Sequence, residues 1–346
     1  MKDWMIQFGD SGLVAKWDDF VLNNPGGTLW HSSSFLKCIS NSFGYSLKLL
    51  YVEKEGEMVA LLPLFSVPGL FGISNKLIGV PVSSWCGIIC NSDEHESDLL
   101  KEARNWGNDL GAEYIEYRQI KKLRTNQSVK STYVTFIFDL GEGSEVLWES
   151  MNRKTRGAIR KARKSELEVN VNNGSLDDFY NIYARRLHDL GSPAYSMDFF
   201  ESLKREFGDD ALITTVSKGG VIISACFSIK YKDTLYALLA GVNKRYLSLN
   251  PYSLMYWKLI EFACKEGLAK FDFGRSRIGT GSYDFKKNWG FPSTSLYYHY
   301  DLLKVAKIPA LEAGSMSTKL FQFTWKMMPY PLVKKLGPGL RKYIVA

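Results

Sequence analysis

The chain has 346 residues, of which 45% are hydrophobic and 23% are charged. This composition excludes a disordered protein, and the length suits two packed domains. The formal net charge is +8, and its excess lies in residues 313–346, which carry basic side chains and no acid.

The N-terminal sequence and the cysteines indicate an intracellular protein. The opening MKDWMIQFGDSG contains Asp3 and lacks a long apolar run, so the sequence predicts no signal peptide and a cytoplasmic protein. The five cysteines include no C-x-x-C pair, and the four histidines are far apart. Reduced structural thiols and no metal site are therefore expected.

Residues 58–75, MVALLPLFSVPGLFGISN, contain no charged side chain. A membrane-spanning helix is one interpretation, but Pro63, Pro68, Gly69 and Gly72 would interrupt it. The sequence instead predicts a buried strand followed by a loop.

Two parts of the chain repeat one order of elements at a distance of about 160 residues, which is too long for a solenoid and fits a doubled domain. Residues 47–65 and 211–229 each have the pattern of a β-hairpin with glycine in its turn. Residues 97–118 and 253–275 each have the pattern of a helix followed closely by a strand.

Both predicted helices end at a glycine, Gly111 or Gly267, in the place of a C-cap. The shared order predicts two α/β domains of similar plan, at 1–145 and 165–300. Residues 146–164 would join them as a basic helix.

The connecting helix contains MNRKTRGAIRKARK, a run of cations without an acid. At helical spacing the apolar side chains share one face. The opposite face would carry Arg153, Arg156, Arg160, Arg163 and Lys164. A solvated helix is the simple interpretation, but mutual repulsion among these cations favours a phosphate-bearing partner, such as a nucleic acid, a nucleotide or an anionic head group.

Residues 271–291, FDFGRSRIGTGSYDFKKNWGF, contain glycines and basic residues that suggest a phosphate-binding loop. Two glycines have the Walker spacing, but Thr280 and Gly281 stand where that motif needs lysine and serine or threonine. The Rossmann pattern fails because Asp284 replaces its third glycine. The glycines are therefore predicted to let the chain turn sharply after a strand.

Three segments, MNRKTRGAIRKARK, YARRLHDLGSPAYSMDFF and FDFGRSRIGTGSYDFKKNWGF, resemble the FemA/FemB-like (FemAB) proteins. The resemblance is strongest to the bacterial group associated with exopolysaccharide and PEP-CTERM (exosortase) gene clusters. It extends over nearly the whole chain and implies an α/β (α+β) fold of two tandem GNAT-like, acyl-CoA N-acyltransferase-like domains. The chain departs from other Fem proteins at residues 188–200, which lack a recognisable acceptor-binding pair, and in having no coiled-coil arm.

The resemblance also implies a function. Fem enzymes move an amino acid from aminoacyl-tRNA to an amine of a peptidoglycan precursor, and other GNAT relatives use acyl-CoA. The expected activity is an acyl or aminoacyl transfer to an amine of a cell-envelope glycan, peptidoglycan or exopolysaccharide precursor, without a permanently bound cofactor. Two alternatives are an acyl-CoA-dependent N-acetyltransferase acting on a sugar or small-molecule amine, and a non-catalytic scaffold in a polysaccharide assembly system.

The Phe-Lys pair of the Fem active site matches Phe285-Lys286, which implies that Lys286 supplies a cation to the donor and that Phe285 shapes the pocket. A surface lysine is the alternative, but the aromatic neighbours predict partial burial, where an unused cation is costly. The substrate-binding candidates are Asp272, Arg275, Tyr283 and Trp289. Because both donors are rich in phosphate, the candidates for binding the donor phosphates are Arg153, Arg156, Arg160 and Lys164.

Residues 301–346 form a basic and aromatic tail. In TKLFQFTWKMMPYPLVKKLGPGLRKYIVA, apolar side chains such as Phe323 and Met327 alternate with lysines. One interpretation is an amphipathic segment on an anionic membrane, which would place the protein at the inner face of the cell membrane. The other is docking of the aromatic side chains on the domain body.

Overall fold

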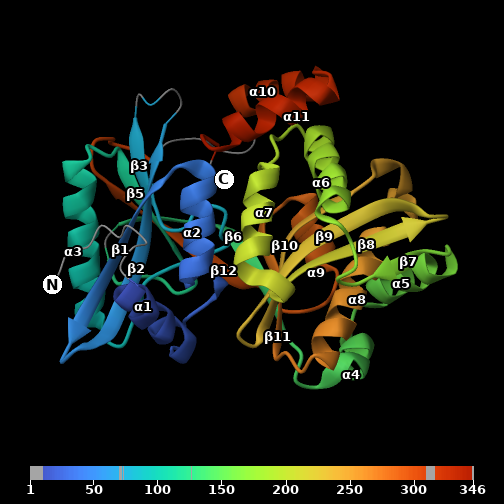
Figure 1. The fold of residues 1–346 in the computed structure, drawn as a ribbon, viewed down its shortest axis with the longest axis horizontal. Helices are drawn as coiled ribbons and strands as arrows, with labels where there is room; N and C mark the ends of the chain where they lie inside the picture. The colour runs from blue at the N-terminus through green and yellow to red at the C-terminus, as the bar shows by residue number, and fades with distance from the viewer. Residues whose placement is uncertain (1–10, 70–71, 73, 126, 309–315, 345–346) are drawn as a thin grey trace. The chain divides into compact units, whose positions relative to one another are not determined.

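The computed structural model describes residues 11–69, 72, 74–125, 127–308 and 316–344. The chain divides into two compact units, which are coloured along the sequence in Figure 1. Unit 1 is the chain as far as Thr132 together with the segment that begins at Ser295. Unit 2 runs from Tyr133 to Thr294 and includes the C-terminal helices as far as Arg341.

Unit 1 is a mixed sheet with helices. Its strands lie in the order β1-β2-β3-β5-β12, and β4 pairs with β2. The hydrophobic core joins the sheet to α3 through residues such as Leu62, Leu99 and Ile115. The elements are α1 (Ser11–Asn23), η1 (Leu29–His31), α2 (Ser33–Phe43), β1 (Ser46–Lys54), β2 (Glu57–Pro68), β3 (Asn75–Ile78), β4 (Ile89–Cys90), α3 (Asp93–Asp109), β5 (Tyr114–Gln119) and β12 (Thr294–Leu302).

Unit 2 has the strand order β6-β11-β10-β9-β8-β7. Its elements are β6 (Ser128–Asp139, which begins in unit 1), α4 (Gly143–Ser150), α5 (Arg153–Lys164), β7 (Glu168–Asn170), α6 (Leu176–Leu190), α7 (Met197–Phe207), η3 (Gly208–Asp210), β8 (Ala211–Lys218), β9 (Val221–Tyr231), β10 (Thr234–Val242), η4 (Lys244–Leu249), α8 (Pro251–Lys265), β11 (Lys270–Arg277), α9 (Gly281–Lys287), α10 (Met316–Met327) and α11 (Tyr330–Arg341).

Helices cover both faces of the unit 2 sheet. Alternate side chains of β9 point to opposite faces. Cys226 belongs to the core that contains α8, whereas Phe227 contacts Phe179 of α6 and Phe200 of α7. In Figure 1, α6 and α7 lie in front of β8, β9 and β10.

The internal repeat is confirmed. The hairpins β1–β2 and β8–β9 are both antiparallel. Gly111 and Gly267, which follow α3 and α8, have φ values of +63° and +73°, the left-handed conformation that glycine adopts without strain. The buried strand predicted within residues 58–75 is β2.

The two units exchange strands along the chain. The last part of β6, from Tyr133, pairs with β11 in unit 2, although it follows the strands of unit 1 in the sequence. Conversely, β12 follows α9 of unit 2 but pairs with β5 in unit 1. The predicted range 1–145 includes β6, and the predicted range 165–300 includes most of β12, so each range holds a strand that pairs in the other unit. The sequence repeat could not indicate this, because it carries no information on pairing partners.

The connecting segment is two helices rather than one. Helix α4 ends at Ser150, and α5 begins at Arg153 with Asn152 as its N-cap. Met151 and Asn152 have ψ values of 149° and 138°, which are not helical, so the chain is interrupted between α4 and α5.

Candidate functional site

The central strands of unit 2 separate from each other. Strands β10 and β11 pair in parallel only from Thr234 to Tyr236 and from Lys270 to Asp272. Both strands continue beyond this point, where β10 pairs with β9 and β11 pairs with β6. The middle of the sheet therefore opens after Tyr236 and Asp272, and the next residues of β10, Leu238 to Ala240, are partly exposed.

Both strands are irregular at the opening. The register of β10 on β9 shifts between Ala237 and Leu239, so Leu238 has no register partner on either neighbouring strand. The register of β11 on β6 shifts between Asp272 and Arg275. Gly274, inside this shift, has a φ of +75°, which a residue with a side chain rarely adopts. The bulges turn backbone groups of both strands out of the regular ladder.

Asp272 lies where the two strands part and is 2% exposed. Its Oδ1 accepts the Gly274 backbone N–H at 2.7 Å and the Thr135 hydroxyl at 3.4 Å. Burial raises the pKa of the Asp272 carboxyl to about 6, against the lowering effects of the Gly274 hydrogen bond and of nearby Lys286. The carboxyl group therefore changes its charge near neutral pH.

Lys286, on α9, reaches back to β11. Its Nζ donates hydrogen bonds to the carbonyl oxygens of Gly274 at 2.9 Å and Arg275 at 3.1 Å, and lies 5.4 Å from the centre of the Phe273 ring. Burial lowers the pKa of Lys286 to about 8; Arg275 acts in the same direction, and Asp272 opposes it. An ammonium has three N–H donors, so one N–H of Lys286 has no acceptor within the described part of the chain.

The other candidates from residues 271–291 divide into two groups. Phe285 is half-buried and packs edge-on against Phe273, near the lysine. Tyr283 is half-buried beside Phe136, and Arg275 lies over the Tyr133 ring at 5.1 Å.

Trp289 differs from these residues because it is 1% exposed and lies in the core of unit 2. Its ring packs against Phe138 and Phe273 at centroid distances of 6.3 and 5.3 Å. A side chain so enclosed packs the core that supports α9, and we do not include Trp289 among residues that contact a substrate.

Helix α5 begins next to α9. The Asn288 carbonyl oxygen, two residues after Lys286, accepts hydrogen bonds from Asn152 Nδ2 at 3.1 Å and Thr155 Oγ1 at 2.5 Å. Arg153 lies between these two donors in sequence. The structure thus brings the start of the basic helix close to the end of the helix that carries Lys286.

The predicted burial pattern of α5 is confirmed, since Ile159 and Ala162 are buried while Arg153, Arg160 and Lys164 are exposed. Some of the cations have partners within unit 2, which the sequence did not indicate. Arg156 forms an ion pair with Glu149, and Arg163 with Glu261 at 3.1 Å.

Trp148 also contacts the basic helix, because the guanidinium groups of Arg160 and Arg163 lie 5.5 and 5.2 Å from its ring. Arg153 and Lys164 have no ion pair or hydrogen bond from their side chains within the described residues. Arg153 and Lys164 therefore carry free positive charge at the two ends of α5.

In unit 1 the strands that correspond to β10 and β11 are β3 and β5, and the space beyond their pairing is filled by a loop of the same unit. Strands β3 and β5 pair in parallel over Leu77–Ile78 and Ile115–Glu116. The following loop returns to β5, since the Gly79 N–H donates to the Glu116 carbonyl at 2.9 Å and the Cys86 N–H to the Arg118 carbonyl at 3.1 Å.

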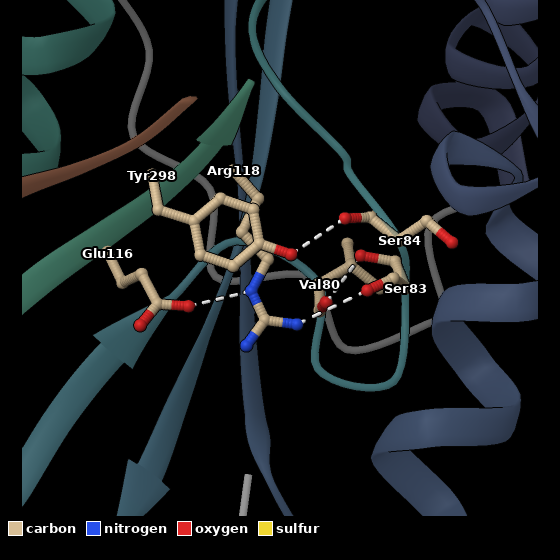
Figure 2. A network of polar contacts seen from close by, with 6 residues as sticks. All are labelled: Val80, Ser83, Ser84, Glu116, Arg118 and Tyr298. Atoms are coloured by element: carbon tan, nitrogen blue, oxygen red, sulfur yellow. Dashed lines mark hydrogen bonds and ion pairs between the residues drawn. The ribbon is translucent and has the colours of Figure 1, made fainter. Parts of the chain in front are cut away.

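A buried ion pair holds this loop (Figure 2). Arg118 is 1% exposed; its Nε donates to Glu116 at 2.7 Å and its Nη1 to the Ser83 carbonyl at 3.3 Å. The Tyr298 ring lies 5.2 Å from the guanidinium, and its hydroxyl donates to the Ser84 carbonyl at 2.8 Å. These contacts are internal to unit 1, so the open pair of strands in unit 2 is the better candidate for a substrate site.

Sequence reasoning missed some residues of the site. Leu238 and Thr135 carry no local signal, because a bulge and a contact between distant strands depend on pairing. The glycine at 274 was predicted to turn the chain after the strand, but it lies inside β11.

The comparisons with known proteins identify the fold class. Residues 149–287 match the family model described as acetyltransferase (GNAT) domain. This segment contains β10, β11 and α9, and therefore the separated strands and Lys286. No curated protein sequence matches the chain.

Solved structures extend the likeness to most of the chain. The crystal structure of FemX is similar with a TM-score of 0.65 at 14% identity, covering 88% of this chain and 98% of that one. A tandem GNAT protein from the clavulanic acid biosynthesis pathway has a TM-score of 0.54 at 10% identity, with 86% and 98% covered. L-PGS from Bacillus licheniformis has a TM-score of 0.52 at 12% identity, with 84% and 95% covered.

The chain has a mixed α/β fold of the GNAT type. It is more particularly a tandem GNAT fold, as in FemX and the clavulanic acid pathway protein, and this confirms the predicted fold class. Among the described residues, no helix combines the length and apolar character that a membrane span requires.

Proposed function

We propose that the protein is an acyltransferase that moves an acyl or aminoacyl group to an amine of a cell-envelope glycan, peptidoglycan or exopolysaccharide precursor. The observation that carries the proposal is the Lys286 ammonium, held at the separated strands with one N–H unused, beside the Asp272 carboxyl. The FemAB resemblance supplies the class of acceptor.

The reaction needs stabilisation of negative charge and removal of a proton. A neutral acceptor amine attacks the acyl carbonyl, a C–N bond forms, and the electron pair of the C=O bond moves to oxygen. The Lys286 N–H donates to this oxyanion, which forms only as the reaction proceeds. When the oxyanion collapses, the thioester or ester bond breaks, and the leaving sulfur or oxygen takes up one proton, which balances the proton that the amine nitrogen loses.

Asp272 is the acceptor of the proton that the attacking nitrogen loses, directly or through a water molecule. A carboxylate with a pKa of about 6 is ionised at neutral pH and still basic enough to accept a proton. Leu238 and its neighbours on β10 offer backbone groups out of the ladder for holding the acyl donor. Phe285 packs on Phe273 near Lys286, and Tyr283 and Arg275, which contact side chains of β6, are the further candidates for substrate contact.

The donor is aminoacyl-tRNA or acyl-CoA, and both carry phosphates. Of the four cations predicted to bind these phosphates, Arg153 and Lys164 have no partner in the described part of the protein, and the start of α5 is close to α9. Arg156 and Arg160 contact Glu149 and Trp148, so their charge is partly used within the protein. The reaction would then take place in the cytoplasm, at the inner face of the cell membrane when the acceptor is lipid-linked.

A transfer assay tests the proposal. Purified protein would be incubated with labelled acetyl-CoA, longer acyl-CoA or charged tRNA, together with amino sugars and peptidoglycan-type amines. We expect label in an amide product with one donor class, and its loss in Lys286→Met. Absence of transfer from every donor across the panel of amines would favour the scaffold alternative.

A second candidate is an acyl-CoA-dependent N-acetyltransferase acting on a sugar or small-molecule amine. It is favoured by the match of residues 149–287 to an acetyltransferase (GNAT) domain. Transfer from acetyl-CoA with no transfer from charged tRNA would select this candidate.

A further inference from the structure

The C-terminal helices α10 and α11 are attached to unit 2 by one face. Trp325 is 2% exposed and Val333 is 4% exposed. The guanidinium of Arg341 donates to the Tyr195 hydroxyl at 2.8 Å, and Lys334 donates to the Asn181 side chain at 3.1 Å. Docking of the tail on the domain body, one of the two interpretations of the sequence, therefore applies to this face.

The opposite face of α10 carries large apolar side chains in solvent. Leu320 is 61% exposed, Phe323 is 63% exposed and Met327 is 72% exposed. Their spacing of three and four residues places them together, and at about 100° per residue they lie opposite Trp325. On α11, Leu332 and Leu336 are likewise exposed, at 45% and 43%. Large apolar groups gathered in this way mark a binding surface more often than scattered ones do.

Lysines border this apolar group. Lys319 and Lys326 fall within one arc of about 120° with the three apolar side chains of α10. Both are exposed and form no ion pair within the described residues, and the same holds for Lys335 on α11. Residues 316–344 contain no aspartate or glutamate. All the charged side chains that α10 and α11 contribute to this surface are therefore cationic.

We propose that Leu320, Phe323 and Met327, with Lys319 and Lys326, form a docking face for an anionic lipid surface, referred to below as the α10 face. The apolar side chains enter the boundary between head groups and acyl chains, and the lysines lie at the level of the lipid phosphates. The helix lies parallel to the membrane plane while its Trp325 side stays on unit 2.

Charge selects a lipid surface over a second copy of the chain. An isologous contact through the α10 face would bring the lysines of one copy against the same lysines of the other, without an acid to compensate. An anionic bilayer offers negative charge to every lysine at once. The proposal is independent of the chemistry at Lys286, because none of the residues of the α10 face belongs to that site.

Vesicle flotation with the full-length protein tests the inference. We expect the protein to float with vesicles of phosphatidylcholine mixed with phosphatidylglycerol, and to float much less with phosphatidylcholine alone. Binding would weaken at an ionic strength of about 1 M, where the Debye length is about 3 Å.

Two variants separate the apolar and the charged contributions. Phe323→Asp with Met327→Asp removes the insertion and should abolish flotation. Lys319→Gln with Lys326→Gln should weaken binding to the anionic vesicles by roughly fivefold for each lysine. The matched control is Val221→Asp, which changes an apolar side chain of unit 2 that is 56% exposed at the start of β9. Circular dichroism checks that each variant is folded.

Three results would overturn the inference. The first is equal flotation with neutral and anionic vesicles, and the second is unchanged flotation of the Phe323→Asp, Met327→Asp variant. The third is a concentration-dependent dimer in light scattering that this variant dissociates, since the α10 face would then be occupied by a second copy. Transfer activity with soluble substrates is expected to be the same in both α10 variants, which separates this test from that of the proposed function.

Discussion

The Lys286 ammonium donates a hydrogen bond of 2.9 Å to the carbonyl oxygen of Gly274. Gly274 has a positive φ at the register shift of β11, just after this strand separates from β10. The bulge therefore presents carbonyl groups to the lysine, and these fix the amine where the sheet opens. An amine held by two backbone carbonyl groups of a strand is well suited to act on a reacting group, because it loses little conformational freedom when the substrate binds.

Replacement of Lys286 by methionine tests its role in the chemistry. The variant keeps an unbranched side chain over Phe273, one heavy atom shorter than lysine, but removes the cation. We expect kcat to fall by about 10²–10³-fold, the usual effect of losing one donor to an oxyanion. The measurement is the steady-state transfer rate, with Lys287→Met as the matched control, since Lys287 is exposed and lies over Tyr283. An equal loss in both variants would contradict a specific role for Lys286.

The pH dependence of kcat/KM follows from the two shifted groups. Asp272 must be ionised to accept a proton, so activity should rise as pH increases through its pKa of about 6. Lys286 must be protonated to donate to the oxyanion, so activity should fall as pH increases through its pKa of about 8. A bell-shaped profile is expected, and Asp272→Asn should remove its acidic limb. A rate that increases through pH 8 would show instead that neutral Lys286 acts as a base.

Substitution of Gly274 tests the bulge. Alanine at a φ of +75° is strained, so Gly274→Ala should lower the free energy of unfolding by roughly 1–2 kcal/mol and reduce kcat by displacing the carbonyl groups that hold Lys286. Urea unfolding and the transfer assay measure the two effects. Gly157→Ala on α5 is the control, because it has no positive φ and no atom lies within 4 Å of the added Cβ. Full activity in Gly274→Ala would mean that the bulge is not needed for catalysis.

Charge reversal at the ends of α5 tests donor binding. Arg153→Glu with Lys164→Glu should weaken the affinity for the donor, and the slope of log Kd against log salt should decrease by about one for each donor phosphate that the variant no longer binds. Lys265→Glu reverses an exposed lysine of α8 and should change neither quantity. An unaltered Kd in the double variant would favour the interpretation of α5 as a merely solvated helix.

The buried ion pair of unit 1 makes a prediction about stability. Glu116→Gln leaves the Arg118 guanidinium buried without its carboxylate partner, and breaking such a pair costs about 3–5 kcal/mol. Replacing both residues, as Glu116→Leu with Arg118→Met, should cost less than Glu116→Gln alone because the guanidinium is no longer left buried without its carboxylate. Urea unfolding followed by circular dichroism compares the variants. The reverse order of stability would mean that Arg118 finds another partner.

The parts of the fold that depend on local sequence could be predicted. The hairpins, the capping glycines at 111 and 267 and the buried face of α5 are determined by side-chain periodicity and by φ values within a few residues. Lys286 was found through the family resemblance together with its aromatic neighbours. The same aromatic pattern also suggested Trp289 as a substrate contact, but Trp289 lies in the core. A sequence pattern does not distinguish an aromatic residue that lines a site from one that packs in the core.

The parts that depend on pairing between distant residues could not be predicted. The separation of β10 from β11, the bulge at Leu238 and the closure of unit 1 by Arg118 each join segments far apart in the sequence. Glu261, which pairs with Arg163, is likewise almost a hundred residues away, so the cations of α5 looked unpaired in the sequence alone.

The exchange of β6 and β12 has a consequence for the folding of the chain. A fragment that ends at residue 145 would contain the strands of unit 1 up to β5 but not β12, so one side of β5 would become an open edge. Exposed edges of this kind pair with other chains and lead to aggregation. During synthesis the N-terminal half likewise has to wait for β12, and such long-range pairing makes folding slow. A fragment shortened at the sequence repeat is therefore expected to aggregate, and the full-length chain is expected to refold slowly.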